Sequence, residues 1–158
     1  MTGRKLFFQI ELARGDSEVD LTVRWENYAA TAGGCEKTIV FGGKAKLSGL
    51  WVPDRAAAAY VDRQPGRLIG FHSIDPAQPG WRDKMIEAHQ DLKMKCIKLL
   101  SMYAGFMPNG RRFDYISEYA TKHALPVLLH TGTTFAAQTQ LECTIPRLGN
   151  QLCICNGP

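Results

Sequence analysis

The chain has 158 residues, enough for one domain with a buried core and too few for two. Hydrophobic residues make up 45% of the sequence and charged residues 22%, which is typical of globular proteins and excludes a disordered chain. The net charge of +4 is spread thinly along the chain rather than gathered with aromatic residues on one basic face, so the composition argues against a nucleic-acid-binding protein.

The five cysteines are scattered through apolar segments, and none belongs to a Cys-x-x-Cys pair. Their odd number and their spacing indicate free thiols in a reducing compartment rather than disulfides or a zinc finger. The first residues lack the pattern of a signal peptide, and no apolar run has the length of a membrane span. We therefore expect a cytoplasmic protein without a membrane partner.

Hydrophobic spacing and turn residues predict a single domain over residues 1–158, of which residues 1–19 are poorly defined apart from a short strand at 6–10. Further strands are expected at residues 37–41, 67–72, 95–100 and 126–130. Helices are expected at residues 20–32, 56–61, 81–94 and 113–123, and a long loop at 101–112.

These apolar strands begin about 30 residues apart with a helix between each pair, which is the spacing of βαβ units. The pattern predicts an α/β protein with a parallel sheet covered by helices. A doubly wound sheet and a (β/α)₈ barrel both fit this rhythm. The sequence has no Gly-x-Gly-x-x-Gly and no Gly-Lys-Ser/Thr, so a nucleotide-binding doubly wound sheet lacks its best evidence. An open flavodoxin-like sheet that binds a phosphorylated ligand stays as an alternative.

Residues 125–135 contain the most informative side chain of the chain, His130. Apolar residues run into this histidine, and a turn rich in hydroxyl groups follows it. The pattern indicates a short buried strand that ends in a group able to bind a metal or move a proton. The carboxyl ends of parallel strands are where such chemistry is found. The alternative is a core histidine whose ring is satisfied by the backbone.

Several segments in barrel order resemble the amidohydrolase superfamily, in particular its amidohydrolase-related (amidohydrolase 2) branch of metal-dependent hydrolases and decarboxylases. The most specific is Leu-Pro-Val-Leu-Leu-His-Thr-Gly-Thr-Thr-Phe at residues 125–135. The others are residues 38–42, 67–71, 75–76, 97–99, 102–108, 141–142 and 146–148. The resemblance implies a partial (β/α)₈ TIM barrel that contains strands two to five, since a full barrel takes about 250 residues.

The resemblance also implies that His130 is a ligand of a divalent metal, normally zinc. Such an ion would activate water to hydrolyse a C–N or C–O bond, or would assist the loss of carbon dioxide. The family's His-x-His motif is absent from this sequence, and one imidazole is too few to hold zinc. We therefore expect a fragment that is inactive alone and that binds zinc no better than a surface histidine does.

Other candidate residues have a functional and a structural interpretation. Lys98 lies where binuclear members carry a modified lysine that bridges two metals, but it could instead reach the rim or pair with a carboxylate. Tyr103 and Phe106 could wall the pocket of a small-molecule substrate, or pack against a helix. Thr131 and Thr133 could donate hydrogen bonds to a substrate carboxylate, or cap the next turn. His72 is interpreted as structural.

A second hypothesis comes from another class of protein. Half of a barrel leaves the strands near residues 37 and 126 unpaired at their outer edges, and open edges favour association. The chain would then be a non-catalytic half-barrel that acts as a binding or assembly module, with a homo-oligomer formed through the exposed edges.

Overall fold

The computed structural model describes residues 24–131, 139, 140 and 143. The strand predicted at residues 6–10 lies outside this part of the chain, as does the start of the first predicted helix. The elements in chain order are α2 (Trp25–Thr31), β1 (Thr38–Phe41), β2 (Lys44–Ala45), the 3₁₀ helix η1 (Lys46–Ser48), β3 (Leu50–Trp51), α3 (Asp54–Val61), β4 (Leu68–Ile74), α4 (Trp81–Gln90), β5 (Cys96–Leu99), α5 (Ser101–Ala104), α6 (Arg111–Lys122) and β6 (Val127–Leu129).

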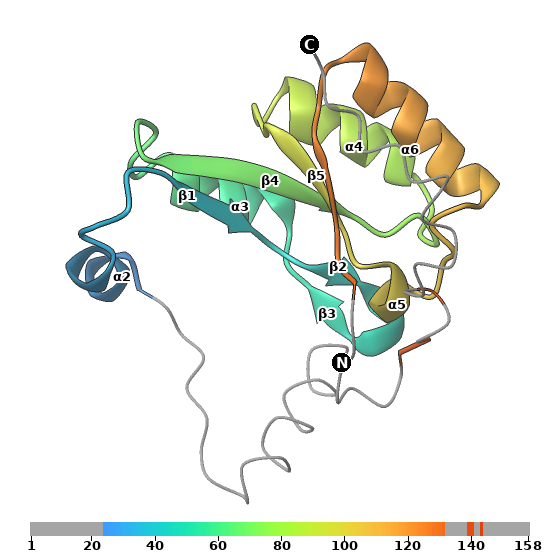
Figure 1. Ribbon diagram of the computed structural model, residues 1–158, viewed down its shortest axis with the longest axis horizontal. Helices are drawn as coiled ribbons and strands as arrows, with labels where there is room; N and C mark the ends of the chain where they lie inside the picture. The colour runs from blue at the N-terminus through green and yellow to red at the C-terminus, as the bar shows by residue number, and fades with distance from the viewer. Residues whose placement is uncertain (1–23, 132–138, 141–142, 144–158) are drawn as a thin grey trace, which may run out of the picture.

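The main sheet has four parallel strands in the order β1-β4-β5-β6, which is also their order in the chain (Figure 1). Each βαβ connection therefore moves one strand further in the same direction. A doubly wound sheet reverses its order at a switch point, whereas a barrel does not. This strand order confirms the prediction of an α/β fold that forms part of a (β/α)₈ barrel.

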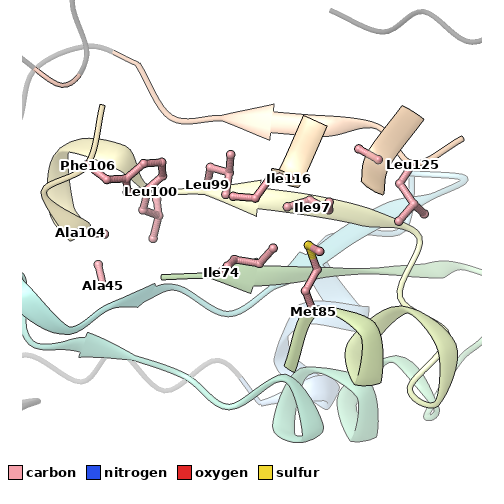
Figure 2. Close-up of a cluster of buried hydrophobic side chains, with 11 residues drawn as sticks. Ala45, Ile74, Met85, Ile97, Leu99, Leu100, Ala104, Phe106, Ile116 and Leu125 are labelled. Atoms are coloured by element: carbon pink, nitrogen blue, oxygen red, sulfur yellow. The ribbon is translucent and has the colours of Figure 1, made fainter. Parts of the chain in front are cut away.

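Helices α3, α4 and α6 pack against one face of this sheet, where alternate strand residues form the core. Ile74, Ile97 and Leu99 of the strands meet Met85 of α4 and Ile116 of α6, and all are at most 3% exposed (Figure 2). Met85 and Ile116 lie on the buried faces of their amphipathic helices. No helix in the described part of the chain has the length and apolar character needed to cross a membrane.

Two short features were not predicted. Residues 44–51 form the antiparallel pair β2–β3 around η1, and the first residues of the expected loop at 101–112 form α5. Strands of two residues are too short for any alternation to mark them in a sequence. Helix α4 also ends at Gln90 rather than at residue 94, because Lys93 has a positive φ of 56° and the Met94 N–H bonds back to the Ala88 carbonyl.

A buried ion pair fixes the β2–β3 hairpin to the main sheet. The Lys44 ammonium contacts the Asp54 carboxylate at the start of α3. Ser73 of β4 joins the two residues, since its Oγ accepts a hydrogen bond from the Lys44 N–H (3.0 Å) and its own N–H donates to Asp54 Oδ1 (3.2 Å). The hairpin is thereby held at the carboxyl ends of β1 and β4.

The turn between β1 and β2 depends on a residue without a side chain. A Cβ added at Gly42 would lie 2.6 Å from both Cβ and Cγ1 of Val52 and 3.2 Å from the Val52 carbonyl oxygen. We expect Gly42→Ala to destabilise the chain by about 1–3 kcal/mol through overpacking, measured by urea unfolding. Gly34→Ala is the matched control, because an added Cβ there has nothing within 4 Å. Equal stabilities of the two variants would contradict this account of the turn.

Candidate functional site

The register of the sheet places Lys98 and His130 on the same face. Lys98 of β5 pairs with Ser73 on one side and with Leu128 on the other. Side chains alternate between the two faces of a strand, so Lys98 and Leu128 lie on the face opposite the core residues Ile97 and Leu99. His130 follows Leu128 by two residues and belongs to the same face, at the carboxyl end of the sheet.

Lys98 is a buried cation on this face. Its side chain is 5% exposed, and its Nζ lies 5.4 Å from the centroid of the Phe41 ring. Burial lowers the pKa of the Lys98 ammonium. Among the described residues, no carboxylate lies within ion-pairing distance of it. The lysine is therefore desolvated without a negative partner from this part of the chain.

His130 is held beside this lysine by its backbone and by its ring. Its N–H donates a hydrogen bond to the Leu99 carbonyl (2.9 Å), which continues the β5–β6 ladder past the end of the strand. Its ring contacts Tyr103 of α5 edge to face, with centroids 5.4 Å apart. Burial and then the charge of Lys98 lower the pKa of His130. The imidazole is therefore neutral at neutral pH, the form that accepts a proton or binds a metal.

The other predicted site residues have different positions. Tyr103 is brought to His130, whereas Phe106 is 5% exposed and packs in the main core with Leu100. Thr131 is exposed directly after His130. Thr133 lies outside the described residues. The structure thus gathers Lys98, Tyr103 and His130 but turns Phe106 inward.

Two further residues of this face were not singled out from the sequence. The Phe41 ring lies against the Lys98 ammonium. The alternation of side chains along residues 38–41 could have identified Phe41 as a residue of this face. Cys96 lies two residues before Lys98 on the same strand. Burial raises the pKa of the Cys96 thiol to about 11, so this cysteine is not an activated nucleophile.

His72 is separate from this site. It was expected at the end of its strand, but β4 continues to Ile74, and alternation places His72 with Ile74 on the face that the helices cover. Its side chain is fully buried, and neither ring nitrogen has a hydrogen-bond partner among the described residues. The position agrees with a structural histidine.

The described residues do not by themselves fit a catalytic metal. Nowhere in this part of the chain do three His, Cys, Asp or Glu side chains come together in an arrangement that could hold an ion. A catalytic zinc takes three protein ligands as a rule, and the described residues of this face offer the imidazole of His130 and the Cys96 thiol, whose pKa is raised by burial.

A sheet that winds in one direction, with helices on one face and polar groups at its carboxyl end, defines the class of (β/α)-barrel proteins. A sequence profile of the family described as amidohydrolase matches residues 18–151, and the chain belongs to this family. Members of the family generally use divalent metal ions.

One solved structure supports the fold. The chain is similar to the uncharacterized TIM-barrel protein Bb4693 from Bordetella bronchiseptica, with a TM-score of 0.64 and 19% sequence identity. The match covers 76% of this chain and 43% of that chain, so this chain spans less than half the length of its structural relative. At this identity the similarity concerns the fold alone. No curated protein matches the chain.

Proposed function

We propose that Lys98, Tyr103 and His130 are this chain's part of the active site of a metal-dependent hydrolase or carboxy-lyase, with a small carboxylate-bearing molecule as substrate. One observation carries the proposal. Lys98 is a buried ammonium without a carboxylate partner among the described residues, and it lies beside a neutral histidine at the carboxyl end of the sheet. Removing a charge from water is costly unless an opposite charge compensates it. A substrate carboxylate would provide that charge.

The residues of the site have distinct roles in this proposal. Lys98 binds the substrate carboxylate, and the exposed Thr131 hydroxyl adds a hydrogen bond to it, as Thr133 would. Tyr103 packs on the His130 ring and orients it, and Phe41 forms an apolar wall.

His130 is the proposed ligand of a divalent ion, with zinc preferred. The ion would supply activated water or polarise a carboxylate. One imidazole is too few to hold it, so turnover is not expected from these residues alone. A reducing, cytoplasmic location is part of the proposal, because Cys35, Cys96 and Cys143 are free thiols.

The proposal predicts that the chain binds benzoate, a simple aromatic carboxylate, through Lys98. Replacing Lys98 with methionine is expected to weaken benzoate binding by about tenfold or more, since a hydrogen bond to a charged group contributes about 1.5–3 kcal/mol. Isothermal titration calorimetry gives the affinity. Lys37→Met is the matched control, because Lys37 is exposed just before β1, at the amino end of the same sheet. Equal affinities of the two variants would refute the assignment of Lys98.

A second candidate function is an assembly module without catalysis. It is favoured by three exposed apolar side chains on the face of the sheet away from the helices: Ile39 (48% exposed), Phe41 (47%) and Leu128 (39%). In the described part of the chain β1 and β6 each pair on one side only, and open edges with apolar faces favour self-association. A dimer in sedimentation velocity that Leu128→Glu dissociates, together with no benzoate binding at Lys98, would support this second candidate.

A further inference from the structure

Helices α4 and α6 run side by side (Figure 1). They bring together a cluster of three rings, on the face of the sheet opposite Lys98 and His130. It consists of His89 near the end of α4, Tyr119 in the last turns of α6 and His123, which follows α6 directly. The ring centroids are 5.1 Å apart for His89–His123, 4.4 Å for Tyr119–His123 and 5.8 Å for His89–Tyr119. All three side chains are half-buried, so the cluster is held by its surroundings and is still reached by solvent.

The hydrogen bonding of His89 leaves one nitrogen for a further partner. Its Nδ1 lies 2.9 Å from the Tyr119 hydroxyl. Metal-binding histidines typically use one ring nitrogen for the ion and the other for a hydrogen bond that fixes the ring. Tyr119 occupies that orienting position at His89, and Nε2 is the nitrogen that stays available.

The spacing of the two imidazoles fits a shared ion. With metal–nitrogen distances of about 2.0–2.1 Å and tetrahedral angles, two imidazoles on one ion have ring centroids about 5 Å apart. The observed separation of His89 and His123 is 5.1 Å.

The electrostatic environment favours a neutral ring at His89. Burial, then the charges of His123, Lys95 and Lys93, lower the pKa of His89. A neutral imidazole is the form that binds metals. The same two lysines oppose a cation, so the affinity is modest.

We propose that His89 and His123 form a binding site for a divalent late first-row cation such as nickel or zinc, oriented by Tyr119 and completed by water. No third His, Cys, Asp or Glu joins them within the described residues, so the site is open and weaker than a structural zinc centre. The bound ion links α4 to α6. The site is independent of the proposed chemistry at Lys98 and His130.

Nickel is the probe for the test, because it is paramagnetic and broadens the NMR signals of nearby rings. The protein carries Cys35→Ser, Cys153→Ser and Cys155→Ser, since thiolates also bind such ions. The chain has four histidines, His72, His89, His123 and His130, which single substitutions assign. We expect substoichiometric nickel to broaden the rings of His89 and His123 before those of His72 and His130.

Calorimetry on variants gives the second readout. Tyr119→Phe removes the group that orients His89 and is expected to weaken nickel binding by about tenfold. His89→Gln or His123→Gln removes a ligand itself, and is expected to weaken nickel binding by about tenfold or more. His72→Leu removes a fully buried histidine that is not part of the proposed site, and it is expected to leave the affinity unchanged. The proposal is overturned if nickel first broadens His130, or if His89→Gln and His123→Gln bind nickel as the parent protein does. The order in which nickel broadens the histidine signals of the protein with all four histidines tests the proposal even if a variant folds poorly.

Discussion

Replacing Lys44 with methionine is expected to destabilise the chain by about 3–5 kcal/mol, because the Asp54 carboxylate would remain buried without its cation. The side chains of Lys44 and Asp54 are only 8% and 7% exposed. A carboxylate left alone at such a position loses both water and its counter-charge. Urea unfolding at neutral pH measures the effect as a lower midpoint.

Two further variants separate this buried pair from an ordinary surface contact. Arg55→Met removes the cation of the exposed Arg55–Glu87 pair, where Arg55 is 77% exposed, and is expected to cost at most about 1 kcal/mol. Combining Lys44→Met with Asp54→Asn is expected to recover most of the lost stability, since the amide is neutral and still accepts the Ser73 N–H. If Lys44→Met costs no more than Arg55→Met, the pair is not the buried anchor of the β2–β3 hairpin.

Acidification is expected to destabilise the chain through His72, by up to about 5 kcal/mol between pH 6.5 and pH 3. Burial, then the charges of Lys44 and His89, lower the pKa of His72 to about 3 in the folded chain. The unfolded chain takes up this proton near pH 6.5, whereas the folded chain stays neutral until about pH 3. Between these values the unfolded state binds more protons, so the free energy of unfolding falls as the pH falls.

A single substitution isolates this contribution from those of the carboxylates. His72→Leu has a similar volume and no titratable group, and it is expected to flatten the fall in stability between pH 6.5 and pH 4. At neutral pH it is expected to stabilise the chain by about 1–3 kcal/mol, because neither ring nitrogen of His72 has a partner among the described residues. Urea midpoints across this pH range, compared with the parent protein, test both effects. Parallel pH profiles would mean that His72 does not titrate as described.

Much of the fold was predictable because its signals are local. The apolar runs at residues 37–41 and 95–100 have a strand's length, and each lies about one βαβ unit from the next predicted strand in the chain. The strands β1 and β5 were therefore expected close to where they occur. The period of two along β5 places Lys98 on the face opposite Ile97 and Leu99, and the structure shows that this face lies away from the helices.

The parts that were missed depend on contacts between residues far apart in the chain. Lys44 meets Asp54 only because Ser73 of another strand binds both of them. Phe106 lies in a segment predicted as a loop, but it follows α5 and packs in the core. His89 and His123 are 34 positions apart (123 − 89) and meet only because α4 and α6 pack as neighbours. No pattern within a window of ten or twenty residues carries this information.

Titration of the His130 ring by NMR tests most directly whether Lys98 and His130 form one site at the carboxyl end of the sheet. In the parent protein the pKa of His130 is expected below its ordinary value of about 6.5. In Lys98→Met it is expected to rise, because a neighbouring positive charge is removed, while Lys37→Met leaves it unchanged. An identical pKa of His130 in the parent protein and in Lys98→Met would contradict the claim.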